Sequence, residues 1–140
     1  MARGRKGWCE HYRGTANGDT CAAGVKYADV TDKSTSPHSL PCIEKWNLSG
    51  VTCDKCEMPT PEQVAAREAE MQKRYADIGA ARKAIVEACG GPWKKGVAGS
   101  GGRIDCPVCK AVNGLAFSRS GYNGHIHAKC LADKCVAWME

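Results

Sequence analysis

Apolar residues recur every seven positions in the middle of the chain, which is the pattern of one face of a long helix. The repeating residues are Val64, Met71, Ile78 and Ile85. Three arrangements would cover such a stripe: packing against the chain's own cysteine-rich modules, a seam in a homodimer, or a groove on another partner. Packing within the chain is our first expectation, and a homodimer through the helix at residues 60–89 is the second.

The ends of this helix are marked by residues that favour helix termini. Thr60 is a good N-cap, Pro61 suits the first helical position, and Gln63 has the spacing of a capping box. The Gly-Gly-Pro run at residues 90–92 stops the helix. We therefore expect a long helix within residues 59–90, followed by a glycine-rich linker over residues 91–103.

The pattern changes after the linker, where residues 104–140 predict a β-hairpin. Residues 115–118 favour a short strand, residues 120–124 a turn and residues 125–130 a return strand. The apolar residues of this segment would form a small core made of Phe117, Ile126 and Trp138.

Residues 1–58 differ from both other segments because they are irregular and rich in Gly, Pro, Ser and Thr. The predicted fold class is therefore small α+β and metal-stabilised. It combines a loop-rich, cysteine-rich N-terminal zinc module over residues 1–58, one long central α-helix, and a C-terminal β-hairpin zinc ribbon over residues 104–140.

The composition explains why metal is expected. Leu, Ile, Val and Phe make up about 14% of the 140 residues, below the roughly 20% at which a chain buries an ordinary core. So small a core cannot offset the conformational entropy lost on folding. The ten cysteines are the obvious additional source of stability. With no signal peptide or long apolar stretch in view, we expect a reducing, cytoplasmic compartment, where clustered cysteines bind metal more often than they form disulfides.

The last segment carries the clearest metal motif. Its four ligands would be Cys106, Cys109, Cys130 and Cys135. A Cys-x-x-Cys turn presents two thiolates to one ion, and a hairpin about twenty residues long returns two more. Four cysteines already complete a tetrahedral zinc site, so His125 and His127 are not needed as ligands.

The N-terminal segment holds six further candidate ligands. The preferred set is Cys9, Cys21, Cys42 and Cys53, with Cys56 and His11 as alternates. A site that uses Cys53 and Cys56 together as a knuckle is nearly as well supported. With one site in each cysteine-rich segment, we expect two Zn²⁺ per chain, although iron also binds four thiolates.

Residues for contact with a partner are expected on one face of the hairpin. Strand alternation puts His125, His127 and Lys129 on that face, with Ile126 and Ala128 on the other. Tyr122 in the turn and Arg119 beside it complete the candidate partner-binding set.

The formal net charge of +5 lies mostly in the last segment, where residues 91–140 carry seven basic and three acidic side chains. Each four-thiolate zinc site has a formal charge of −2, so two sites would lower the total to +1. The basic balance is therefore weak evidence for a nucleic-acid partner.

The cysteine-rich segments contain a further set of motifs. They are Cys9-Glu-His-Tyr-Arg-Gly, Cys21-Ala-Ala-Gly-Val-Lys-Tyr27, Pro41-Cys42, Cys53, Pro59-Thr-Pro-Glu62 and the run from Ser118 to Cys130 with Cys135 and Trp138-Met-Glu140. These motifs resemble those of uncharacterised small zinc-ribbon proteins encoded by bacteriophages and prophages. The resemblance covers most of the chain. It implies a phage product that acts in the bacterial host cytoplasm, brings no known activity, and favours Cys53 alone over the knuckle.

These observations predict a non-enzymatic phage accessory protein that binds a host or phage protein or nucleoprotein. One version is an inhibitor of a bacterial defence system such as a CRISPR effector complex. The alternative is a regulatory zinc ribbon that binds DNA or RNA, with phosphate contacts from basic side chains and base stacking on Tyr122 or Trp93. The basic candidates are Lys94, Lys95, Arg103, Lys110, Arg119 and Lys129. We expect no enzyme, because the Cys-x-x-Cys motif lacks a βαβ context and no acidic group is placed to hold a catalytic metal.

Overall fold

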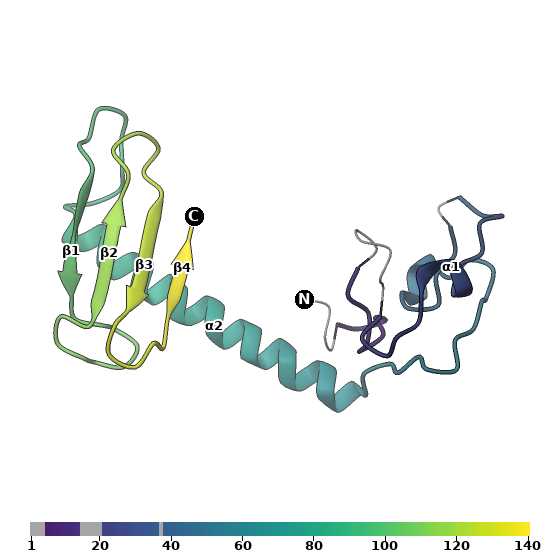
Figure 1. Cartoon of the computed structure of the whole chain (residues 1–140). Coiled ribbons are helices and arrows are strands. Elements are labelled where there is room, and N and C mark those ends of the chain that lie inside the picture. The colour runs from purple at the N-terminus through teal and green to yellow at the C-terminus, as the bar shows by residue number, and fades with distance from the viewer. Residues whose placement is uncertain (1–4, 15–20, 37) are drawn as a thin grey trace. The chain divides into compact units, whose positions relative to one another are not determined.

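The computed structural model describes residues 5–14, 21–36 and 38–140. The chain divides into two compact units, Met1–Ala69 and Glu70–Glu140. The first contains the short helix α1 (Tyr27–Val30) and the 3₁₀ turn η1 (Glu44–Trp46). Helix α2 (Pro61–Ala88) runs through the boundary between the units, and the four strands belong to the second unit (Figure 1).

Helix α2 begins and ends as its sequence predicts. The amide of Gln63 donates to Oγ1 of Thr60 at 3.2 Å, and the amide of Thr60 donates to Oε1 of Gln63 at 2.9 Å, which is a complete capping box. At the other end the amides of Gly90 and Gly91 donate to the carbonyls of Glu87 and Val86 at 3.0 and 2.9 Å. Both glycines have positive φ angles, which glycine adopts without a steric penalty. The prediction of one long helix is confirmed.

The second unit contains a four-stranded antiparallel sheet in the order β1-β2-β3-β4. The strands are Ser100–Ile104, Leu115–Arg119, Ile126–Cys130 and Ala137–Met139. The two strands of the predicted hairpin are β2 and β3, in the register Leu115↔Cys130 at one end and Arg119↔Ile126 at the other.

Two sequence predictions about this region are wrong. The ribbon is a four-stranded sheet, not a two-stranded hairpin, and residues 100–103 of the predicted linker belong to strand β1. Strand β1 begins Ser-Gly-Gly, which has no alternation of apolar and polar side chains. It is a strand because its backbone pairs with β2, which the side-chain pattern alone does not predict. The close approach explains a glycine here, because a Cβ at Gly101 would lie 3.1 Å from the carbonyl oxygen of Phe117.

One face of the sheet packs against the second half of α2. Ala81 and Ile85 of the helix are fully buried in one cluster with the sheet residues Leu115 and Ile126. The predicted core is therefore right for Ile126, whereas Phe117 and Trp138 are only partly buried against the same cluster.

The apolar stripe of α2 is covered over part of its length. Ile85 is buried and Ile78 partly buried, so packing within the chain accounts for this end of the stripe. Met71 is 54% exposed and the neighbouring Tyr75 is also exposed. Homodimerisation through residues 60–89 stays a prediction.

The described residues of the first unit have little regular structure before α2. Its small core gathers Cys9, Tyr12, Leu40, Cys42 and Ile43. Isolated backbone bridges join Trp8 to Ile43 and Tyr12 to Cys21. Within this unit Arg67 of α2 forms an ion pair with Glu10, with Nη1 and Oε1 2.8 Å apart. Across the described residues of the whole chain, no helix has the length and apolar character needed to cross a membrane.

Candidate metal centre

The four cysteines of the last segment meet at one end of the sheet. Cys106 and Cys109 lie in the tight turn after β1, Cys130 is the last residue of β3, and Cys135 lies in the loop before β4. The turn is closed by the amide of Lys110, which donates to the carbonyl of Cys106 at 2.9 Å. The amide of Cys130 donates to the carbonyl of Val136 at 2.8 Å, which folds the second pair back toward the first.

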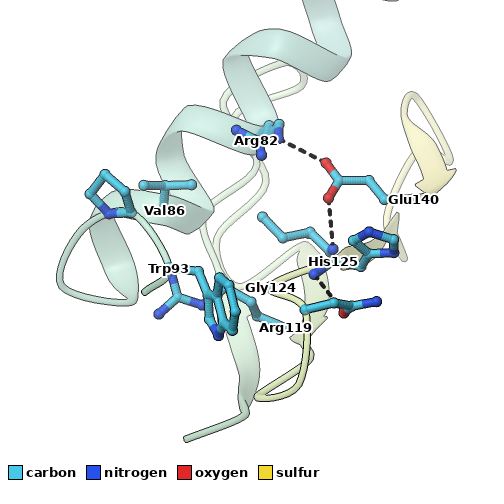
Figure 2. Close-up of a pocket in the computed structure, with 10 residues that line it drawn as sticks. Arg82, Val86, Trp93, Arg119, Gly124, His125 and Glu140 are labelled. Carbon is cyan, nitrogen blue, oxygen red and sulfur yellow. Dashed lines mark hydrogen bonds and ion pairs between the residues drawn. The ribbon is translucent and has the colours of Figure 1, made fainter. Parts of the chain in front are cut away.

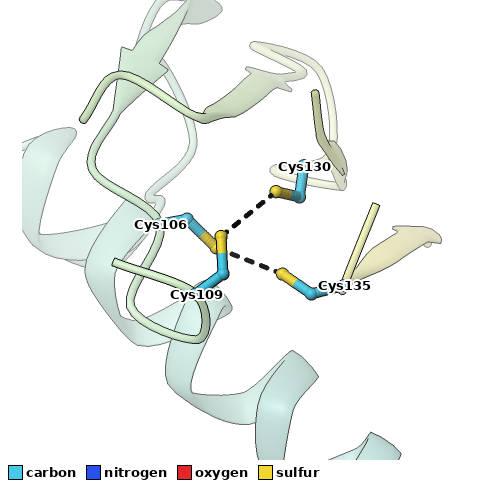
Figure 3. Close-up of side chains that lie close together, drawn as sticks. All are labelled: Cys106, Cys109, Cys130 and Cys135. Carbon is cyan, nitrogen blue, oxygen red and sulfur yellow. Dashed lines mark hydrogen bonds between the residues drawn. The ribbon is translucent and has the colours of Figure 1, made fainter. Parts of the chain in front are cut away.

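The sulfur atoms have the spacing of ligands that share one ion. The ligand atoms of all four cysteines lie within 4.8 Å of one another. The sulfurs of Cys106 and Cys135 are 3.5 Å apart, and those of Cys109 and Cys130 are 3.6 Å apart (Figure 3). A tetrahedral site with metal–sulfur bonds of about 2.3 Å needs sulfur–sulfur distances of about 3.8 Å, whereas a disulfide needs about 2.05 Å. The four cysteines are therefore positioned for one metal ion.

The pKa values of two thiols of the quartet are shifted in opposite directions. Burial alone would raise the pKa of Cys130, but hydrogen bonds from the amides of Asp133 and Ala132 and from neighbouring thiols outweigh it and lower the pKa to about 6. Burial and its thiol neighbours raise the pKa of Cys135 above its usual 9.0. The Cys130 thiol is therefore largely ionised at neutral pH, whereas the Cys135 thiol loses its proton when a metal ion displaces it.

The N-terminal candidates are less tightly gathered. Cys9 and Cys42 are buried, and Cys21, Cys53 and Cys56 are partly buried. Among the described residues, three or more Cys, His, Asp or Glu ligand atoms that all lie within 4.8 Å of one another are found at the C-terminal quartet. The alternate ligand His11 is directed to another group, because its Nε2 lies 3.1 Å from Oε2 of Glu57.

Most of the predicted partner-binding residues lie on the surface. His127 and Lys129 are exposed on β3, where they alternate with buried Ile126, Ala128 and Cys130. His125 is also exposed, just before the strand, and Tyr122 in the turn is 91% exposed.

The prediction that Arg119 contacts a partner is wrong. Its residue is only 4% exposed. Its guanidinium donates from Nη1 to the carbonyl of Gly91 at 2.8 Å and from Nη2 to the carbonyl of Cys89 at 3.4 Å. Both carbonyls lie just after Ala88, the last residue of α2, so Arg119 of β2 supplies hydrogen-bond donors to the segment that ends the helix.

A cavity of about 310 Å³ opens beside this contact (Figure 2). The register of β2 and β3 puts it at the opposite end of these strands from the quartet. Arg82 and Glu140 close one side, with Nε and Oε1 2.8 Å apart. The other oxygen of Glu140 accepts a hydrogen bond from the amide of Ile126 at 3.0 Å. Burial would raise the pKa of Glu140, but the hydrogen bonds from Arg82 and Ile126 outweigh it and lower the pKa. The contacts of Glu140 with Arg82 and Ile126 were not predicted, because they depend on β4 and its register, which the sequence pattern does not indicate.

Comparison of the chain with protein-family models, with curated proteins and with solved structures found no match.

Proposed function

We propose that the chain is a non-enzymatic zinc-binding protein of a phage, and that it binds a protein or nucleoprotein partner through the exposed face of its four-stranded sheet. The observation that carries the proposal is the side of the sheet that α2 leaves open. On this side Arg103, His127 and Lys129 are exposed, while the opposite side packs against the helix. We call these three residues and the exposed Met139 the basic sheet face.

The strand register supports this surface as one patch. Arg103 pairs with Ala116, and Ala116 pairs with Lys129. Ser118 pairs with His127, and His127 pairs with Met139. Since paired residues on neighbouring strands point to the same side of a sheet, these side chains form two adjacent rows. Among residues 100–139, all of them described, the strand positions on this side include no carboxylate.

Zinc suits the quartet better than the other common metals. Four thiolates in a tetrahedral arrangement select zinc or iron, and zinc requires no redox partner. The proposal includes the second zinc ion that the sequence predicts for residues 1–58. Zinc bound to four cysteines has no open position for water or a substrate, which supports a structural role for the metal and a non-enzymatic function.

The second candidate function is binding of DNA or RNA by the same face. Residues 70–140 contain 11 Lys and Arg side chains and 6 Asp and Glu side chains, so all of the formal net charge of +5 lies in this unit. A four-thiolate zinc site lowers the charge of the unit to +3. The basic sheet face therefore keeps its attraction for phosphates, although Arg119 is not part of it.

One experiment separates these functions. The tagged zinc-loaded protein and its Arg103→Glu/Lys129→Glu variant are used for affinity capture from a bacterial lysate, with and without nuclease. The control variant is Lys83→Glu/Arg74→Glu, which makes the same charge change on α2. We expect a partner that the wild type and the control retain and the sheet-face variant loses. Equal capture by all three would contradict the proposal, and capture that nuclease abolishes would favour the nucleic-acid alternative.

A further inference from the structure

The first unit brings its cysteines together through its backbone. The amide of Cys9 donates to the carbonyl of Cys42 at 2.8 Å, and the adjacent residues Trp8 and Ile43 form a backbone bridge. Two segments more than thirty residues apart are therefore joined at these two cysteines. Cys9 is 2% exposed and Cys42 is 5% exposed, so both thiols lie inside the small core of this unit.

The Cys53-Asp-Lys-Cys56 turn joins the same place. The amide of Cys56 donates to the carbonyl of Cys53 at 3.1 Å, which closes a tight turn between the two cysteines. The next residue, Glu57, fixes the turn against the first segment. Its carbonyl accepts from the amide of Glu10 at 2.7 Å, and its amide donates to the sulfur of Cys9 at 3.3 Å. A backbone amide aimed at a sulfur stabilises a thiolate more than a neutral thiol.

The thiols are close enough to affect one another. Burial, followed by the charges of Cys9, Cys21 and Cys53, raises the pKa of Cys42 to about 11. Burial, followed by Cys9, Cys42 and Cys53, raises the pKa of Cys56 to about 12. Cys42 and Cys56 thus each have several other cysteines of this unit nearby. Gathered thiols resist ionisation when no cation is present and become ligands when a divalent cation balances their charge.

Cys21 is less central than Cys56. It joins this unit through a backbone bridge to Tyr12. Its sulfur, like that of Cys9, accepts a hydrogen bond from a backbone amide, here of Ala23 at 3.3 Å, so its position in the unit and not this contact sets it apart. Cys21 is not among the residues that form or cover the buried cluster of this unit, whereas Cys56 packs against it. The sulfur of Cys56 also lies 3.8 Å from the carbonyl oxygen of Pro41, the residue before Cys42. The packing therefore favours Cys56 over Cys21 as the fourth ligand.

We infer that the first unit holds a second zinc centre whose ligands are Cys9, Cys42, Cys53 and Cys56, with Cys53 and Cys56 as a knuckle and Cys21 outside the ligand set. This ligand set replaces the one first expected from the sequence, in which Cys21 stood in place of Cys56. The inference rests on the zinc chemistry of the proposed function and adds the ligands of the second ion. Among the described residues only the quartet has three or more ligand atoms within 4.8 Å of one another, so metal binding would bring the four sulfurs of this second set closer together.

A purely apolar role explains these residues less well. A free cysteine is often a small buried side chain. Here, however, the buried core formed by the described residues of this unit has few large apolar side chains, namely Leu40, Ile43 and Tyr12 beside the two buried cysteines. A core of this size needs a metal or a disulfide to stay folded. All ten cysteines, each within the described residues, are unbridged.

The test counts metal ions in the full-length protein. Native mass spectrometry and elemental analysis are applied to the wild type, Cys56→Ser and Cys21→Ser after zinc loading. We expect two zinc ions in the wild type, one in C56S and two in C21S. Two ions in C56S together with one in C21S would return the site to the set with Cys21. One ion in the wild type, bound at an intact quartet, would overturn the second centre.

Cobalt in place of zinc gives a second measurement, because its absorption spectrum reports the ligands and the geometry of the site and not only the number of ions. In a Cys109→Ser/Cys135→Ser chain the quartet is removed, so the cobalt spectrum reports the first unit alone. A four-thiolate tetrahedral spectrum that C56S weakens and C21S leaves unchanged supports the inference. An octahedral spectrum, or none, overturns it. Failure of partner capture leaves these metal counts unchanged, so the two proposals fail separately.

Discussion

Gly124 and Trp93 touch so closely that no other residue fits at position 124. A Cβ built on Gly124 would lie 2.6 Å from Cγ of Trp93, and the φ angle of Gly124 is +75°. Trp93 follows the end of α2 in the sequence. Its indole lies over the turn between β2 and β3, beside Arg119 (Figure 2). A turn glycine thus anchors the segment that connects helix and sheet.

Gly124→Ala should destabilise the second unit by about 2–4 kcal/mol, because it combines a left-handed φ with a steric clash. Urea unfolding followed by tryptophan fluorescence measures the change. The matched control is Gly79→Ala in α2, where a Cβ meets nothing within 4 Å. That substitution should stabilise the protein by about 0.5–1 kcal/mol, since alanine favours a helix. Equal effects of the two variants would contradict the role of the contact.

Arg119→Ala should cost about 2–4 kcal/mol of unfolding free energy. The change removes two charge-assisted hydrogen bonds and leaves the carbonyls of Gly91 and Cys89 with fewer donors inside the protein. The control is Arg103→Ala, an exposed arginine on β1, which should change stability by less than about 0.5 kcal/mol. A larger loss of unfolding free energy in Arg103→Ala than in Arg119→Ala would contradict the stabilising role of the Arg119 hydrogen bonds.

The sequence was sufficient for the features that depend on local rules. The capping box at Thr60 and the glycines at the end of α2 are short-range signals, and the helix follows them closely. The quartet was found in the same way, because Cys-x-x-Cys is a local turn and the ligand spacing needs only one hairpin.

Features that depend on tertiary pairing could not be found from the pattern. Strand β1 has two glycines in place of alternating side chains, and β4 has three residues. Arg119 was predicted to contact a partner, but it is buried and donates to carbonyls of the segment that follows α2, a contact between distant parts of the chain. The exposed positions of β3 were predicted correctly, since alternation fixes them once the strand is known.

Removing the quartet should unfold the sheet of the second unit. Cys109→Ser takes away one of the four ligands, and a three-thiolate site binds zinc less tightly, so metal binding contributes less to folding. We expect loss of one zinc ion and of the part of the near-ultraviolet circular dichroism signal that comes from the tryptophans of the second unit, Trp93 and Trp138. The control is Cys89→Ser, because Cys89 lies outside the quartet with its sulfur 3.3 Å from Oγ of Ser100. Retention of zinc and of the tryptophan signal in C109S would rule out the quartet as a structural site.

Zinc binding at the quartet should release a number of protons that depends on pH through Cys130. With a pKa of about 6, this thiol is ionised at pH 8 and contributes no proton when zinc binds. As the pH falls to about 6, half of Cys130 becomes protonated, so each zinc ion should displace about half a proton more, and the affinity should fall more steeply. The C56S variant, which keeps the quartet and loses the proposed second centre, isolates this site. Calorimetry in buffers of different ionisation enthalpy at pH 8 and pH 6 measures the difference.

At the first unit the raised pKa values of Cys42 and Cys56, about 11 and 12, keep both thiols protonated over this whole range. These two thiols should therefore release their protons on zinc binding at both pH values. Equal proton release by the quartet at pH 8 and pH 6 would contradict the lowered pKa of Cys130.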